Sequence, residues 1–112
     1  MPDDDYCYLT TSGRRTGQPH RIEIWYVDAG DSLYMLAGGG SSADWVRNLM
    51  ADPAVHVELD GSVRPGRARV VDAATEAERA RTLVFDKYAP RSGDDLIDWR
   101  KRALPVAIDL TT

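Results

Sequence analysis

"TTSGRRTGQPHRIEIWY" spans Thr10–Tyr26 and joins two β-prone runs through a short polar turn. Gly13 and Gly17 bracket this turn, and glycine reaches the left-handed backbone conformations of tight turns without steric cost. After the turn, residues 21–27 are rich in β-formers and alternate so that a strand would have two distinct faces. The stretch therefore predicts a β-hairpin that carries two adjacent arginines at its tip.

The rest of the chain extends this hairpin into a mainly antiparallel sheet. Further strands are predicted at 6–11, 33–37, 55–59, 63–71 and 106–110, and helices at 44–51, 75–89 and 94–102. Short turns join most of the strands and no βαβ unit repeats, which argues against a Rossmann fold. The order predicts an α+β fold, a small split β-barrel with about six mainly antiparallel strands and two or three flanking helices. One domain of this kind should cover residues 1–112.

Three local signals refine these elements. Hydroxyl side chains ahead of Asp44 are expected to cap the first helix, and the capping box Thr75–Glu78 is expected to start the second. Pro65 and Gly66 lie inside a predicted strand, and they indicate a bulge or an edge position there.

Composition narrows the class of protein and its partners. The chain has 43% hydrophobic and 29% charged residues and no apolar run near the ~20 residues needed to span a bilayer. Its acidic beginning, MPDDDY, lacks the pattern of a signal peptide, so we expect a cytoplasmic location and no stable membrane insertion. The net charge is −4 with locally clustered basic residues, which favours a small anionic ligand over a nucleic acid. Cys7, His20 and His56 do not have the spacing of a zinc site, so no metal is expected.

Two segments are candidates for binding an anion. Arg14 and Arg15 could clamp a phosphate or carboxylate through forked guanidinium hydrogen bonds, or they could form an ordinary solvated hairpin tip. Gly38, Gly39 and Gly40 run into a helix start, where free backbone N–H groups favour anions, or they form a loose connector.

Other residues carry weaker signals. Trp25 and Trp45 fit packing in the core or at the barrel rim better than a stacking platform. Tyr88 lies on the buried stripe of its predicted helix, although its phenol could point into a pocket. The sequence has no nucleophile elbow, zincin motif or recognisable pair of catalytic carboxylates. A protein whose bound redox cofactor does the chemistry needs none of them.

Several motifs occur together in a fixed order. They are LTTSGRRTGQP at 9–19, LAGGGSSADWVRNLMADP at 36–53, AVHV at 54–57 and the closing Trp99 followed by Leu104–Pro105–Val106. Together they resemble the deazaflavin-dependent nitroreductase family, whose pattern reads LTTxGRKSGxPR, a glycine-rich turn, WxxNLxAxP and a VxV strand. The resemblance covers about residues 6–110.

The resemblance implies a split β-barrel that binds the deazaflavin coenzyme F420. Such proteins move a hydride between the reduced deazaflavin and a small electron-poor or quinone-like molecule. Carried onto this chain, the family's cofactor-binding positions are Arg14, Arg15, Thr16, Gly17, Gly38, Gly39, Gly40, Ser41, Trp45 and Asn48. Tyr88 matches one of a cluster of tyrosines at the family's substrate pocket, and we expect it to be catalytic.

The chain departs from the family pattern at the cofactor site and at the substrate pocket. Arg15 and Thr16 replace a lysine and a serine, keeping the charge and the hydroxyl, and the glycine turn lacks the family's lysine or asparagine. Arg91, Ser92 and Asp94 occupy the region of the family's other tyrosines, so the substrate is left open.

Two alternatives and the oligomeric state are also open. The same phosphate clamp would serve an FMN-binding split barrel of the pyridoxamine-phosphate-oxidase type. A non-enzymatic carrier of a cofactor, haem or tetrapyrrole would bind without turnover. A homodimer is plausible because barrel edges and exposed aromatic side chains often pair between chains.

Overall fold

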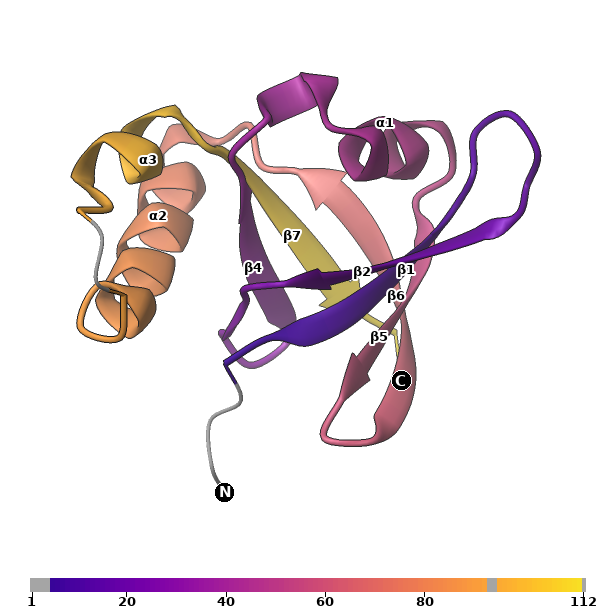
Figure 1. The fold of residues 1–112 in the computed structure, drawn as a ribbon, viewed down its shortest axis with the longest axis horizontal. Helices are drawn as coiled ribbons and strands as arrows, with labels where there is room; N and C mark the ends of the chain where they lie inside the picture. The colour runs from indigo at the N-terminus through magenta and orange to yellow at the C-terminus, as the bar shows by residue number, and fades with distance from the viewer. Residues whose placement is uncertain (1–4, 93–94, 112) are drawn as a thin grey trace.

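One sheet of seven antiparallel strands runs through the computed structural model, which describes residues 5–92 and 95–111. The strands lie side by side in the order β2-β1-β5-β6-β7-β4-β3. Their bounds are β1 Cys7–Ser12, β2 Pro19–Ile24, β3 Val27–Asp28, β4 Ser32–Ala37, β5 Ala54–Leu59, β6 Ser62–Val70 and β7 Leu104–Leu110. The sheet curls strongly on itself (Figure 1). The expected α+β class with a mainly antiparallel sheet is confirmed.

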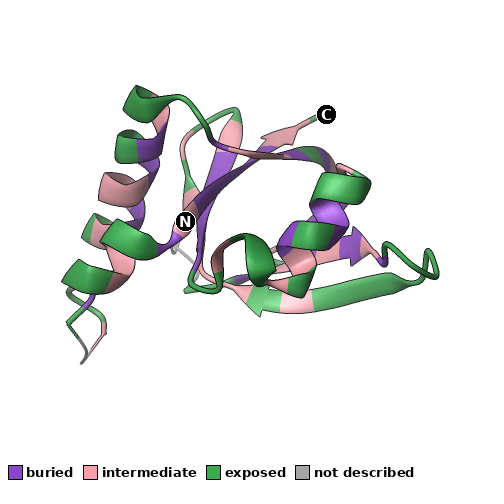
Figure 2. Ribbon diagram, turned by 90° about the horizontal axis from the view of Figure 1, so that it is seen from above, coloured by how far each residue is buried: buried purple, intermediate pink, exposed green. Residues whose placement is uncertain are grey.

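Within the described residues, three α-helices and one 3-10 helix complete the fold. They are η1 Gly40–Ser42, α1 Asp44–Ala51, α2 Ala74–Tyr88 and α3 Ile97–Arg102. Helix α1 contacts β1 and β6 and lies over one end of the curled sheet, whereas α2 packs on β4 with α3 beside it (Figure 1). Figure 2 shows that α2 turns a buried stripe toward the sheet and an exposed face outward. The expected start of the third helix at Asp94 lies outside the described residues.

The predicted hairpin around the arginines is present. Strands β1 and β2 pair from Cys7 opposite Ile24 to Ser12 opposite Pro19. The N–H of Gly13 donates to the carbonyl of Gln18 at 2.8 Å, which closes the turn. Gly17 has a φ of 75°, so the turn does use the left-handed freedom of glycine.

The strand predicted over residues 21–27 is in fact two strands. The ladder of β2 ends at Ile24, and Tyr26 turns into the core, where only 5% of it is exposed. Its backbone N–H donates to the hydroxyl oxygen of Tyr88 at 2.9 Å instead of to a neighbouring strand. Side-chain alternation alone did not reveal this break, because Trp25 and Tyr26 are themselves good β-formers. The break raises the number of strands to seven.

The predicted helix caps are wrong. The N-cap of α1 is Ala43 and that of α2 is Ala73, and neither helix start has a side-chain cap hydrogen bond. Residues 41 and 42 belong to η1 instead. Helix α2 begins at Ala74, one residue before the expected capping box.

The bulge or edge position expected from Pro65 and Gly66 is also wrong, since β6 lies between β5 and β7 and its register with β5 is unbroken there. Pro65 lies opposite the place where β7 ends, and its carbonyl accepts a hydrogen bond from the Thr111 N–H at 3.2 Å. Gly66 is explained by close approach, because a Cβ atom there would lie 2.7 Å from Cγ2 of Ile108.

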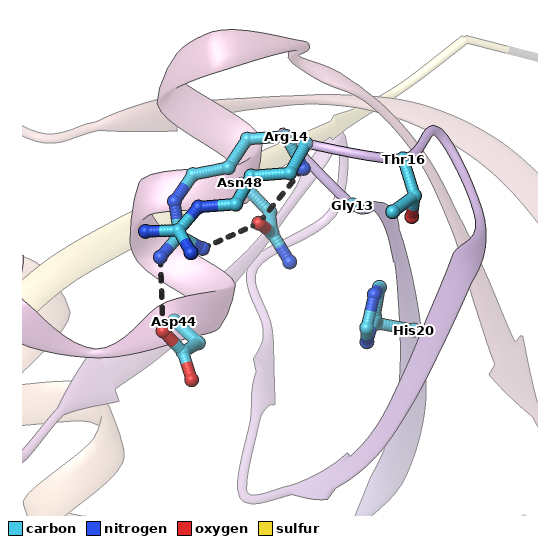
Figure 3. Close-up of a pocket in the computed structure, with 7 residues that line it drawn as sticks. Gly13, Arg14, Thr16, His20, Asp44 and Asn48 are labelled. Atoms are coloured by element: carbon cyan, nitrogen blue, oxygen red, sulfur yellow. Dashed lines mark hydrogen bonds and ion pairs between the residues drawn. The ribbon is translucent and has the colours of Figure 1, made fainter.

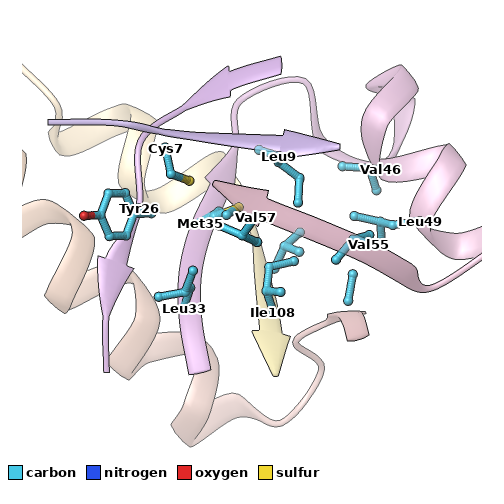
Figure 4. Close-up of a cluster of buried hydrophobic side chains, with 13 residues drawn as sticks. Cys7, Leu9, Tyr26, Leu33, Met35, Val46, Leu49, Val55, Val57 and Ile108 are labelled. Atoms are coloured by element: carbon cyan, nitrogen blue, oxygen red, sulfur yellow. The ribbon is translucent and has the colours of Figure 1, made fainter. Parts of the chain in front are cut away.

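Two apolar clusters make up the core, and β4 belongs to both. Leu33 and Met35 face the cluster inside the curled sheet, which α1 closes with Val46 and Leu49 (Figure 4). The alternate residues of β4 face α2, where the second cluster is Tyr34, Leu36, Val71, Ala77, Ala80, Val84, Tyr88, Leu96, Ala103 and Ala107. The predicted buried stripe of α2, which is Ala77, Ala80, Val84 and Tyr88, is confirmed.

Candidate functional site

A pocket of about 350 Å³ opens where the arginine turn meets α1 (Figure 3). We call it the arginine-turn pocket, and its lining residues are Gly13, Arg14, Arg15, Thr16, His20, Asp44 and Asn48. The β1–β2 turn and the first residues of β2 supply the first five, and α1 supplies the other two. Residues about 30 apart in sequence thus form one site, which the hairpin signal alone could not predict.

Arg14 fastens the turn to α1. Its backbone N–H and its Nη1 both donate to Oδ1 of Asn48, at 3.2 and 2.9 Å. Its Nη2 also pairs with Oδ1 of Asp44 at 3.2 Å, and its side chain is 25% exposed. Figure 3 shows the guanidinium extending over α1. Arg14 therefore acts mainly within the protein, where it holds the arginine turn against α1.

Asn48 connects this contact to the buried interior. Its Nδ2 donates to Oγ1 of Thr11 at 3.3 Å, and both residues are buried. The amide reaches this position because Val46 and Leu49 anchor the inner face of α1 in the core. A buried amide that uses both its oxygen and its nitrogen fixes the distance between helix and turn.

The remaining polar side chains of the pocket have donors available. Arg15 and His20 are exposed, and neither side chain has a hydrogen bond or ion pair with another described residue. Thr16 Oγ1 accepts a hydrogen bond from the Gln18 N–H at 3.2 Å, which leaves its hydroxyl hydrogen available to donate. The pocket therefore offers cationic and hydroxyl donors to a ligand with negatively charged oxygens.

The glycine-rich bend does not line this pocket. Gly38 faces an indole, since a Cβ atom there would lie 3.1 Å from Nε1 of Trp99, and Gly40 has a φ of 60°. Close approach explains the first glycine and backbone conformation the second. Figure 1 shows η1 and the arginine turn on either side of α1. The expected cofactor contacts of Gly38, Gly39, Gly40 and Ser41 stay a prediction.

Two further predicted cofactor residues also lie outside the pocket lining. Trp45 is half-buried and packs against the core cluster inside the curled sheet. Gly17 shapes the arginine turn through its φ of 75° and through its N–H, which donates to the carbonyl of Gly13 at 2.8 Å. The structure thus brings Arg14, Arg15, Thr16 and Asn48 together, and the cofactor roles of all these residues stay predictions.

A second cavity lies at the other end of β2. We call it the tryptophan pocket; its volume is about 250 Å³ and its lining residues are Tyr6, Glu23, Ile24, Trp25, Leu36 and Trp99. The two indoles meet edge to face with ring centres 5.7 Å apart. Ile24 lies four positions after His20 along β2, so the two pockets are roughly 13 Å apart along the strand. The sequence did not reveal this pocket, because its walls come from four separate segments.

Tyr88, the last residue of α2, packs toward the sheet and also lines a small cavity of about 150 Å³ with Asp5, Trp25, Arg91 and Ser92. It is 2% exposed, and its ring stacks on that of Trp25 with centres 4.3 Å apart. Its hydroxyl donates toward the carbonyl of Asp5 at 2.7 Å and accepts from the Tyr26 N–H at 2.9 Å. This geometry favours packing and backbone anchoring. The catalytic role expected for Tyr88 stays a prediction.

A charged network outside both pockets joins α2 to the sheet. The guanidinium of Arg69 forks onto Glu76 at 2.7 and 2.8 Å, and its Nε donates to Asp109 at 2.8 Å. The Tyr34 hydroxyl also donates to Glu76 at 2.8 Å. The hydrogen bonds from Arg69, and then that from Tyr34, lower the pKa of Glu76 to about 2. Sequence reasoning missed this network, because its members lie on four different elements.

Comparisons with known proteins agree with this fold. The family model described as F420H(2)-dependent quinone reductase matches residues 1–111. The chain belongs to this family. A Mycobacterium tuberculosis relative, Rv3178, provisionally named as an F420H(2)-dependent quinone reductase, is 29% identical over 103 residues, which is 89% of this chain and 84% of the relative. The family membership confirms the expected deazaflavin-dependent oxidoreductase, and F420 is the cofactor that the family name carries.

Two solved structures confirm the split β-barrel. One is described as an F420-H2 dependent reductase; it has a TM-score of 0.77 and 20% identity, and the match covers 97% of each chain. The other is described as a domain-swapped dimer; it has a TM-score of 0.77 and 22% identity, and the match covers 96% of this chain and 82% of that chain. At these identities the likeness shows the fold alone.

Two kinds of feature are absent from the described residues of this chain: a metal-binding cluster and a membrane-spanning helix. No group of three or more His, Cys, Asp or Glu side chains within residues 5–92 and 95–111 is placed to hold a metal ion. None of the helices in the same ranges is long and apolar enough to span a bilayer.

Proposed function

We propose that this protein binds F420 with the phosphodiester of the cofactor in the arginine-turn pocket and reduces an electron-poor or quinone-like acceptor. One observation carries the proposal. Arg15, Thr16 and His20, which have donors available, line a pocket that the contact between Arg14 and Asn48 holds in shape. Guanidinium groups bind phosphate oxygens through charge-assisted hydrogen bonds, so this donor set fits a phosphodiester.

The chain supplies binding and orientation, and bound F420 in its reduced form supplies the hydride. The tryptophan pocket is where we expect a flat ring to lie, because Trp25, Trp99 and Leu36 give it apolar and aromatic walls. Its distance from the arginine-turn pocket, roughly 13 Å along β2, suits a ligand whose flat ring and phosphate are joined by a short chain. Gly38 has no side chain at this end, so Nε1 of Trp99 can approach its backbone closely.

FMN remains the alternative cofactor, because the same donor set would also accept a phosphate monoester. A homodimer is also part of the proposal, since one solved structure with this fold is described as a domain-swapped dimer. The location is expected to be cytoplasmic.

Parallel titrations of F420, FMN and FAD against the purified protein, followed by fluorescence and absorbance, test the cofactor assignment. We expect F420 to bind most tightly. Arg15→Ala should weaken F420 binding ten- to a hundredfold, because one charge-assisted hydrogen bond contributes about 1.5–3 kcal/mol. Arg15→Lys keeps the charge and should lose less.

Arg47→Ala is the matched control, because Arg47 is an exposed arginine on α1 outside the pocket lining. Equal weakening by Arg15→Ala and Arg47→Ala would show a general charge effect and contradict the proposed site. Tighter binding of FMN than of F420 would overturn the cofactor. Turnover is then measured with reduced F420 and a simple quinone, and binding without turnover would favour a carrier protein.

A further inference from the structure

We propose that a cavity between α2 and α3 binds a carboxylic acid with an apolar chain, such as a medium-chain fatty acid. We call it the interhelical pocket; its volume is about 580 Å³, and its lining residues are Glu78, Arg81, Phe85, Ile97, Arg100 and Lys101. It shares no lining residue with the arginine-turn pocket or the tryptophan pocket. Figure 1 shows α2 and α3 across the molecule from the arginine turn. The interhelical pocket is therefore independent of the proposed F420 site.

Each of the two helices presents one face to this pocket. Side chains three and four positions apart lie on the same face of a helix. The lining residues follow this spacing on both helices, and they are Glu78, Arg81 and Phe85 on α2 and Ile97, Arg100 and Lys101 on α3. Each face therefore combines one apolar side chain with cationic ones.

The apolar part of the pocket is only partly covered by the protein. Ile97 is 49% exposed, and Phe85 is half-buried at the border of the second core cluster. None of the residues of α3 is buried, so this short helix leaves apolar surface open to water where it faces α2. A hydrocarbon chain lying between Phe85 and Ile97 would remove that surface from water, which favours binding.

Arg81 is the side chain that fits the carboxylate of such a ligand. Its Nε is buried, and no described residue accepts a hydrogen bond from it. Its Nη2 reaches the carbonyl of Ala103 only at 3.4 Å, which is long for a hydrogen bond from nitrogen to oxygen. A buried donor without an acceptor is costly, and a carboxylate satisfies a guanidinium edge through two parallel hydrogen bonds. We therefore place the carboxylate at Arg81.

The remaining charges of the pocket favour an anion. Arg100 is already paired, because its Nη2 donates to Oε1 of Glu78 at 2.9 Å and its guanidinium lies 5.1 Å from the centre of the Phe85 ring. Lys101 is exposed, and no described residue forms a hydrogen bond or an ion pair with it. Glu78 and Arg100 thus offset each other, while Arg81 and Lys101 give the pocket a positive excess. This excess selects against a cationic head group on the ligand.

Calorimetric titration of the whole protein with decanoate, below the concentration at which decanoate forms micelles, tests the site. We expect saturable binding of decanoate. Butanoate has the same head group on a shorter chain, and decyltrimethylammonium has the same chain length with a cationic head group. Both should bind at least about tenfold more weakly than decanoate.

Two variants of α2 test the place of the carboxylate. Arg81→Met should weaken decanoate binding about tenfold or more, because it removes the charge and the hydrogen-bond donors but keeps an apolar side chain. Arg79→Met is the matched control, since Arg79 is an exposed arginine of the same helix outside the pocket lining. It should weaken binding less than about twofold.

Ile97→Glu keeps the test decisive if Arg81→Met does not fold. Ile97 already faces water in part, so the fold should tolerate the change. The new carboxylate removes apolar wall and repels the ligand, and we expect it to abolish measurable binding of decanoate. Unchanged decanoate binding by Ile97→Glu would contradict the proposed site.

Three other results would overturn the proposal. They are no saturable binding of decanoate by the wild type, equal weakening by Arg81→Met and Arg79→Met, and equal affinity for decanoate and decyltrimethylammonium. Co-sedimentation with anionic phospholipid vesicles is measured in parallel. If the protein binds these vesicles but not decanoate, and both arginine variants reduce vesicle binding equally, α2 and α3 form a general basic surface and not a carboxylic acid site.

Discussion

The two adjacent arginines of the turn have different roles. Arg14 uses its backbone N–H and its guanidinium inside the protein, on Asn48 and Asp44, whereas Arg15 faces the pocket without a partner among the described residues. A substitution at each position should therefore fail in a different way. Loss of the first loosens the pocket, and loss of the second removes a ligand contact.

Tyr88→Phe decides between anchoring and catalysis for that phenol. The change keeps the ring stack on Trp25 but removes the hydrogen bonds to Tyr26 and Asp5. We expect the free energy of unfolding to fall by about 1–3 kcal/mol, because the buried Tyr26 N–H loses its acceptor. Turnover per folded molecule should stay within about threefold of the wild type. Denaturant titration and steady-state kinetics with reduced F420 measure the two effects, and a large loss of kcat without a loss of stability would assign Tyr88 to catalysis.

The family pattern predicted Asn48 as a cofactor-binding residue, and the structure places it in the lining of the arginine-turn pocket. Its cofactor role stays a prediction. Its contact with Arg14 spans 34 positions, and no local pattern encodes such a distance. The same reason hid His20, whose place is recognised only when its imidazole is seen against Gly13.

At the scale of elements, the order of strands and helices was predictable and the ends were not. Apolar periodicity located the inner face of α2, because burial repeats every turn of a helix. Helix caps and the break before β3 depend on tertiary contacts such as the hydrogen bond from Tyr26 to Tyr88, so they were missed.

The attachment of α2 to the sheet should depend on pH through Glu76. Arg69 and Tyr34 hold its pKa at about 2, against an ordinary value of 4.5. A lowered pKa stabilises the folded state above pH 4.5, and this contribution is lost as the pH falls toward about 2. Denaturant titrations across this window should show a shallower loss of stability for Glu76→Gln than for the wild type.

Glu78→Gln serves as the control for this prediction. Glu78 is also on α2, but it pairs with Arg100 at the surface and is 67% exposed. Its substitution should leave the slope of stability against pH close to that of the wild type, because exposed ion pairs contribute little. The same flattening in both variants would show that the network around Arg69 has no special part in acid sensitivity.

At the scale of the whole molecule, the one cysteine reports on global unfolding. Cys7 is 1% exposed, and burial raises the pKa of its thiol to about 12. Because the thiolate is the reactive form, a thiol reagent at pH 8 should react at least ~100-fold more slowly with the native protein than with the denatured chain. Saturating F420 should slow the reaction further, since a ligand of the native state reduces unfolding. Rapid reaction of the native protein would show that the barrel opens locally near β1.

The double-sided burial of β4 determines where the chain can be divided. Leu33 and Met35 fill the inside of the curled sheet, while Tyr34 and Leu36 pack toward α2, so the strand has no face that tolerates a new chain end. The Asp60–Gly61 link between β5 and β6 is exposed and belongs to neither core cluster. Two-fragment reporters made from this protein should therefore reassemble when the break lies at that link, and they should fail when it lies within β4.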